Sequence, residues 1–164
     1  HAPWLISLAA GLVVGGLSQV SRLCTVGGFR DLFLFKKSIL IFGYLAVLIG
    51  VFVVNISFGN FHLGFENQPI AHTDGLWNFL GMALAGFCSV LLGGCPLRQL
   101  IMTGEGNSDS AVTVLGLAAG AAFAHNFGLA ASGAGPTLNG EIAVGVGFVV
   151  ALIIAVVNTK RANA

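Results

Sequence analysis

Residues 38–56 have the sequence SILIFGYLAVLIGVFVVNI, without a single Asp, Glu, Lys or Arg. A helix of about 20 mostly apolar residues, with a range of roughly 17–25, can cross the hydrocarbon core of a bilayer. This stretch is therefore predicted to be a transmembrane helix. Four more uncharged apolar stretches of similar length lie at 4–20, 76–92, 111–131 and 142–157. The sequence predicts an all-α integral membrane protein with about five transmembrane helices.

The composition agrees with a membrane location. Apolar residues make up 56% of the 164-residue chain and charged residues only 8%, whereas soluble domains are about 25% charged. The net charge of +1 provides no basic field for nucleic acid. Three cysteines without metal-ligand spacing predict neither a disulfide framework nor a metal site. No cofactor motif, nucleophile triad or carboxylate pair indicates an enzyme.

The basic residues lie in alternate connections between the predicted spans. Positive residues in short loops mark the cytoplasmic side of a membrane. The uneven distribution therefore predicts an external N-terminus and a cytoplasmic C-terminus. The seven residues are in 21–37, 93–110 and the C-terminal tail, namely Arg22, Arg30, Lys36, Lys37, Arg98, Lys160 and Arg161.

Two segments share a glycine and cysteine element, GLSQVSRLCTVGGFR at 16–30 and GFCSVLLGGCPLR at 86–98. In each, an apolar helix leads into a Cys beside a Gly-Gly pair and then an Arg. Glycine and proline weaken helices, so we expect breaks at these pairs, followed by re-entrant half-helices at 29–35 and 97–103. The shared element predicts that residues 4–56 and 76–131 form an approximate repeat. The residues expected to cause the breaks are Gly27, Gly28, Gly93, Gly94 and Pro96.

Cys24 and Cys95 of these elements are candidate contacts for a soft anion, with Arg30 and Arg98 setting the preference for negative charge. Thiols are polarisable, while guanidinium groups and half-helix N-termini attract anions. Burial for packing alone is the competing interpretation, because Cys is often buried. Cys88 is expected to be a packing residue.

The pair His125-Asn126 lies inside the apolar stretch 111–131. Polar side chains within a membrane usually face the protein interior or a wet cavity. The pair is a candidate for the substrate path, and the alternative is a histidine that is satisfied by a backbone carbonyl. A metal site is not expected in the connection 57–75, since His62, Glu66, His72 and Asp74 have no recognised spacing.

Four motifs give the chain a family resemblance over nearly its whole length. It resembles the YeeE/YedE family of sulphur-compound transporters, most closely the YedE-like branch proposed to carry selenium. The resemblance implies an hourglass-shaped helical protein of the bacterial inner membrane, in which axial cysteines, matched here by Cys24 and Cys95, pass thiosulphate inward. The motifs are SQVSRLCTVGGFRD at 18–31, GGCPLRQL at 93–100, GEGNSDS at 104–110 and AHNFG at 124–128.

Members of that family are commonly about twice as long. The resemblance therefore implies that 1–164 is one transmembrane domain that could be half of a longer transporter or could pair with a second membrane chain. The expected partners are a small sulphur or selenium solute and membrane lipid, and no cofactor is expected. Two alternatives remain, a membrane thiol redox or persulphide carrier and a structural subunit that pairs with another membrane chain.

Overall fold

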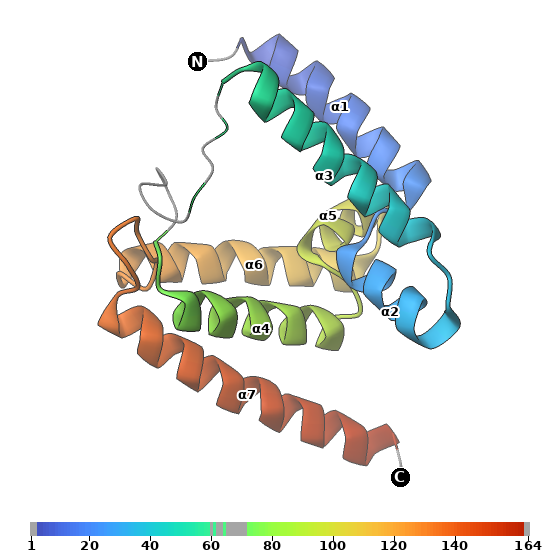
Figure 1. The fold of residues 1–164 in the computed structure, drawn as a ribbon. Coiled ribbons are helices and arrows are strands. Elements are labelled where there is room, and N and C mark those ends of the chain that lie inside the picture. The colour runs from blue at the N-terminus through green and yellow to red at the C-terminus, as the bar shows by residue number, and fades with distance from the viewer. Residues whose placement is uncertain (1–2, 60, 62–63, 65–71, 163–164) are drawn as a thin grey trace. The chain divides into compact units, whose positions relative to one another are not determined.

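The computed structural model describes residues 3–59, 61, 64 and 72–162. Over these residues the chain is helical, and its β pairing is an isolated bridge between Ser132 and Gly135. The predicted all-α class is confirmed. Seven helices follow one another in the described part of the chain (Figure 1): α1 Trp4–Ser21, α2 Thr25–Phe35, α3 Ile39–Ser57, α4 Gly75–Leu91, α5 Pro96–Gly104, α6 Ser108–Asn126 and α7 Leu138–Ala162.

Four segments have the length and apolar composition needed to cross a membrane, and they agree with four of the five predicted spans. They are Trp4–Phe35, Ile39–Ser57, Gly75–Gly104 and Leu138–Lys160. The predicted span at 111–131 is not among them, although α6 covers much of it. Alanine and glycine fill α6 where the other helices carry Leu, Ile, Val and Phe. Only the latter residues strongly favour the membrane centre, so the expected number of five spans exceeds the four identified.

The chain forms two compact units. The first unit contains His1–Asn60 and Gly94–Val114, and thus includes α1, α2, α3, α5 and the beginning of α6. Within it α2 packs against α3, and α1 contacts α5. The second unit contains Phe61–Gly93 and Leu115–Ala164. In this unit α4 packs against α7.

The first helix break lies before the Gly-Gly pair predicted to cause it. Helix α1 ends at Ser21, and Arg22 adopts a left-handed conformation with φ of 50°. Gly27 and Gly28 are inside the first turns of α2, so the prediction that they interrupt the helix is wrong. Gly28 instead lies where α2 packs against α3, since a Cβ there would be in ordinary van der Waals contact, 3.6 Å from the backbone of Leu40 and Ile41.

The second break lies where the sequence predicts it. Helix α4 ends at Leu91, and Gly93 takes a φ of +76°. Pro96 then occupies the first position of α5, where its missing N–H costs no hydrogen bond. Both breaks are followed by short helices, as expected. That these short helices are re-entrant stays a prediction.

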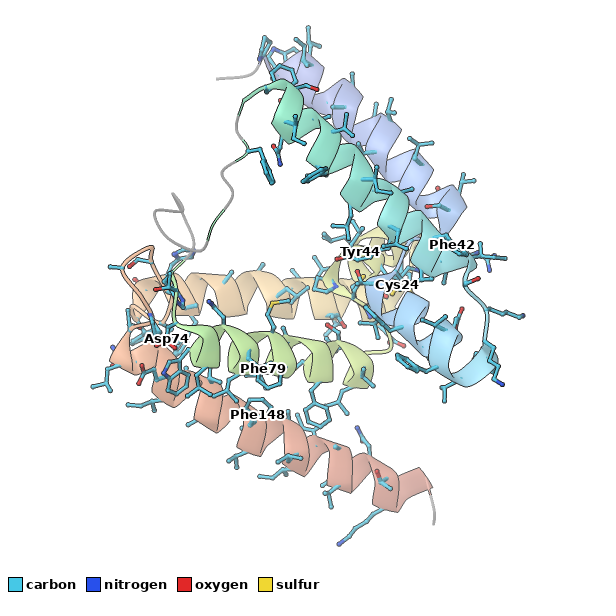
Figure 2. The ribbon with its side chains drawn as sticks, in the orientation of Figure 1. Cys24, Phe42, Tyr44, Asp74, Phe79 and Phe148 are labelled. Atoms are coloured by element: carbon cyan, nitrogen blue, oxygen red, sulfur yellow. The ribbon has the colours of Figure 1, made fainter. Side chains whose placement is uncertain are left out.

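In the second unit, a carboxylate begins α4 and small residues bring α4 close to α7. The Asp74 carboxylate accepts a hydrogen bond from the Trp77 N–H at 3.4 Å, which satisfies an unpaired amide of the first turn. A Cβ at Gly147 of α7 would come within 2.7 Å of a Leu84 methyl carbon. Figure 2 shows Phe79 on α4 and Phe148 on α7.

Candidate functional site

The interior of the first unit consists of small and polar residues, while large apolar side chains face outward. Leu, Ile, Val and Phe side chains are extensively exposed along α1 and α3. Such an arrangement suits a chain whose surroundings are lipid or other protein rather than water. The buried residues in this unit are Ser18, Cys24, Gly28, Gly94, Cys95, Gln99 and Ser110.

Cys24 begins α2. Its backbone is extended, with φ of −149° and ψ of 118°, and its Sγ accepts a hydrogen bond from the Gly27 N–H at 3.3 Å. The residue is only 8% exposed, and Figure 2 shows its side chain at the start of α2. Gly27 is needed for close approach, because a Cβ there would lie 3.3 Å from the Cys24 Cβ.

Cys95 begins α5 in the equivalent position. Its carbonyl accepts the N–H of Gln99 at 3.1 Å, and the residue is 7% exposed. The N–H groups of Leu97 and Arg98 from its own helix lie near its side chain, although that side chain accepts no capping hydrogen bond. The N–H of Thr25, the first residue of α2, lies near it as well. The N-termini of the two short helices therefore meet at Cys95.

The two thiols are neighbours. The Cys24 side chain lies within reach of the Cys95 thiol, and neither is in a disulfide. Helix N-termini carry unpaired N–H groups and a partial positive charge, both of which favour an anion. The convergence of two such termini on two polarisable thiols suits a small anion that carries sulphur. The structure thus brings Cys24 and Cys95 together at the starts of α2 and α5, while their contact with a solute stays a prediction.

Arg98 is in the first turn of α5, three residues after Cys95. Its stem packs over Gly94, since a Cβ at Gly94 would lie 3.4 Å from the Arg98 Cγ. Its Nη2 is 3.6 Å from Glu105 Oε2, and its Nη1 is buried without a hydrogen-bond partner. A buried donor without a partner is costly. Arg98 therefore retains the capacity to bind an anion.

The other predicted site residues lie elsewhere. Arg30 is on the exposed side of α2, with its side chain 57% exposed and its Nη2 2.9 Å from Asp31 Oδ1. The structure does not bring it to the thiols. His125 and Asn126 are exposed at the end of α6, in the second unit. Gly93 is exposed, in the turn before Gly94.

Sequence reasoning missed three polar residues that are buried in the first unit. Ser18, Gln99 and Ser110 are 8%, 4% and 3% exposed. Gln99 could have been found, because it follows Cys95 by four residues and thus shares its helix face. Ser18 and Ser110 gave no comparable signal, since serine is common at helix ends and in connections.

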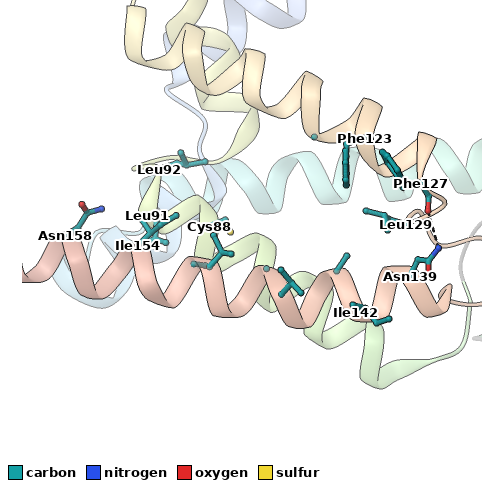
Figure 3. Close-up of a pocket in the computed structure, with 16 residues that line it drawn as sticks. Cys88, Leu91, Leu92, Phe123, Phe127, Leu129, Asn139, Ile142, Ile154 and Asn158 are labelled. Atoms are coloured by element: carbon teal, nitrogen blue, oxygen red, sulfur yellow. Dashed lines mark hydrogen bonds between the residues drawn. The ribbon is translucent and has the colours of Figure 1, made fainter.

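Cys88 belongs to the second unit. It lines an open, largely apolar pocket of about 1290 Å³ between α4, α6 and α7 (Figure 3). Phe123 and Phe127 of α6 also line it, with ring centroids 4.3 Å apart. At one end of the pocket the Asn139 side chain donates to the Phe127 carbonyl at 3.3 Å. These neighbours offer Cys88 packing contacts rather than anion donors.

Within the described residues, no three His, Cys, Asp or Glu side chains gather to hold a metal ion. Two residues considered in the sequence for such a site, His62 and Glu66, lie outside the described residues.

The chain is similar in sequence to known proteins. It is 30% identical over 106 residues to the thiosulfate transporter TsuA of Escherichia coli (strain K12), an alignment that covers 62% of this chain and 28% of that protein. No solved structure matches the chain. Residues 20–162 match the family described as Sulphur transport. The predicted resemblance to a family of sulphur-compound transporters is thereby confirmed, while the selenium branch stays a prediction, and the chain belongs to the sulphur transport family.

Proposed function

We propose that this chain forms the thiol-containing part of a transporter for a small sulphur-bearing anion such as thiosulphate. The observation that carries the proposal is the contact between Cys24 and Cys95 at the converging N-termini of α2 and α5. Family membership supports the solute class, and the similar E. coli protein is named as a thiosulfate transporter.

The proposed site recognises two properties of the solute. N–H groups from Thr25, Leu97 and Arg98 lie near Cys95. They would stabilise the negative charge of the solute without a cation. The polarisable Cys24 and Cys95 sulphurs would contact the terminal sulphur of thiosulphate, which is softer than oxygen. Sulphate has only oxygen atoms at its surface, so it would lack the contact between the cysteine sulphurs and a terminal sulphur atom. The site therefore favours thiosulphate over sulphate.

Selenide carries its negative charge on a soft selenium atom, so the site chemistry extends to it. We propose thiosulphate as the principal solute, because a thiosulfate transporter is among the similar proteins. Stronger competition of selenide than of unlabelled thiosulphate against thiosulphate uptake, measured without oxygen, would reverse this assignment in favour of selenium.

Thiol alkylation is the experiment that tests the site. Maleimide should inhibit thiosulphate uptake by the full-length protein in proteoliposomes. With thiosulphate at ten times its half-saturating concentration, competition predicts about tenfold slower modification of Cys24 and Cys95. Site-resolved mass spectrometry measures both rates, with Cys88 as the internal control, because it lines the other pocket.

Equal protection of all three cysteines would indicate a general conformational effect and contradict the proposed site. A persulphide found on Cys24 or Cys95 after thiosulphate turnover would instead favour the alternative of a covalent sulphur carrier.

We further propose an orientation in the bacterial inner membrane with the N-terminus external and the basic connections cytoplasmic. Arg98 and Lys160 can share the cytoplasmic side only if α6 crosses the membrane before α7 does. The positive-inside tendency thus supports a crossing by α6 despite its modest apolar content. In this arrangement α2 and α5 are half-helices that return to the side from which they enter.

Single-cysteine labelling tests this orientation. In a background with the native cysteines replaced by alanine, positions 37 and 160 should react with an impermeant maleimide only after permeabilisation. Position 62 should react in intact spheroplasts. Reaction of position 160 from outside would show that α6 does not cross, and reaction of position 62 only after permeabilisation would invert the orientation.

The remaining predicted residues belong to the approach to the site. Arg30, exposed on α2, and the pair His125-Asn126 at the end of α6 are proposed to attract or guide the anion rather than to contact it at the thiols. The chain spans 28% of the length of the similar thiosulfate transporter. Our proposal therefore includes a second membrane segment, in the same or another polypeptide, as a partner in transport.

A further inference from the structure

Glu105 is the single carboxylate paired with Arg98 in the described part of the chain. The two side chains are 21% and 35% exposed, and Arg98 Nη2 lies 3.6 Å from Glu105 Oε2. Charge-assisted hydrogen bonds are usually about 2.7–2.9 Å long, so this ion pair is loose. The second terminal nitrogen of the guanidinium, Nη1, is buried without a hydrogen-bond partner. Arg98 is thus only partly neutralised.

We propose that Glu105 is a resident counter-ion that occupies Arg98 when no substrate is bound and is displaced by the arriving anion. The inference rests on the proposed function, in which Arg98 helps to receive the solute. Glu105 is then a specificity-determining residue, because an anion must compete with its carboxylate. A neutral solute gains nothing by displacing it.

The first unit offers space for the displaced carboxylate. Glu105 follows the last residue of α5 and lines a pocket of about 480 Å³ between α1 and α5. Gln19 of α1 lines the same pocket, and its amide can donate to a carboxylate. Gly11 and Gly15 of α1, which also line it, leave room because they have no side chains. Two positions for Glu105 are therefore available, one beside Arg98 and one toward Gln19.

The ion pair is weak enough to be exchanged. Partly exposed pairs of this kind contribute little, because solvent screens the charges and the side chains lose freedom. A dianion that reached both Arg98 Nη1 and the N–H groups around Cys95 would satisfy the buried donor that Glu105 leaves unpaired. Replacement of the Glu105 carboxylate by the substrate at Arg98 is therefore favourable.

Charge-selective thiol reagents test the inference without requiring transport. The rate at which Cys95 reacts with an anionic sulphonatoethyl methanethiosulphonate is divided by its rate with the neutral methyl reagent, both followed by mass spectrometry in the full-length protein. Glu105→Gln should raise this ratio about two- to fivefold, the factor that corresponds to a partly exposed ion pair. Asp109→Asn removes an exposed carboxylate from the next helix and should leave the ratio unchanged.

Glu105→Asp separates local competition from long-range charge. The variant keeps the negative charge but withdraws it from Arg98 by one methylene, so the ratio should still rise, though less than in Glu105→Gln. This variant also tests the inference if the Glu105→Gln protein does not insert into the membrane. In an Arg98→Gln background, Glu105→Gln should have no further effect, because the counter-ion then has nothing to neutralise.

Uptake kinetics supply the second readout. Glu105→Gln should lower the half-saturating thiosulphate concentration by a similar two- to fivefold factor, without a comparable change in maximal rate. A raised half-saturating concentration would show that Glu105 holds Arg98 in place for substrate, which overturns the inference. An unchanged reagent ratio, or an equal rise in Asp109→Asn, would overturn it too. If the parent protein takes up no thiosulphate while the ratio shifts as expected, the proposed substrate fails and the counter-ion role of Glu105 stands.

Discussion

Serine at position 95 is expected to lower thiosulphate uptake about tenfold or more, which corresponds to about 1.4 kcal/mol of lost solute stabilisation. Cys95→Ser nearly preserves the side-chain shape but replaces a polarisable sulphur by a hydroxyl group. The N–H groups around Cys95 would still hold the side chain in place, so insertion and folding should be normal. Cys24→Ser should have a similar effect, because the two thiols are in contact.

The measurement is uptake of labelled thiosulphate by full-length protein in proteoliposomes, at matched amounts of inserted protein. Cys88→Ser is the matched control and should retain most activity, since Cys88 lines the largely apolar pocket of the second unit. Cys95→Ala leaves a small cavity and should lose as much uptake as the serine variant. Parental rates for both Cys24→Ser and Cys95→Ser would leave the thiols as packing residues and remove the basis of the proposed site.

Valine at position 93 is expected to destabilise the break between α4 and α5 by roughly 1–3 kcal/mol. Gly93 has a φ of +76°, a conformation that β-branched residues rarely adopt. A Cβ at this position would meet nothing within 4 Å, so the effect arises from the backbone rather than from a clash. Because the break leads directly into Cys95, thiosulphate uptake should fall together with thermal stability in detergent.

Two further variants control this result. Gly145→Val places the same side chain in α7, where a Cβ also meets nothing within 4 Å and the backbone has no positive φ. It should change thermal stability and uptake little. Gly93→Asn should recover part of the loss, because asparagine tolerates the left-handed region better than other non-glycine residues. Equal stability of Gly93→Val and Gly145→Val would show that the turn does not require this backbone conformation.

The two Gly-Gly pairs show how far a local pattern predicts structure. Gly93 and Gly94 lie in a true break, whereas Gly27 and Gly28 are inside α2. The chain breaks earlier, at Arg22, which adopts the left-handed conformation without being glycine. Helix propensity is weak compared with packing, and the packing of α2 against α3 is consistent with two glycines lying within a helix.

The sequence by itself determined the membrane class, most of the spans and the candidate thiols. Bilayer thickness sets the length of an apolar helix, so uncharged runs such as 38–56 can be identified without knowledge of any contact. Helix α6 was the exception, because its many alanine and glycine residues lack charge without being strongly apolar.

Only the tertiary structure decided which of the candidate residues meet. Cys24 and Cys95 are far apart in the chain, and their contact depends on the convergence of α2 and α5. Arg30 and Arg98 occupy similar places in the two sequence elements, yet the exposed Arg30 pairs with its neighbour Asp31, while the less exposed Arg98 pairs with Glu105. Sequence spacing specifies the face of one helix, whereas the partner across that face is set by how separate helices pack.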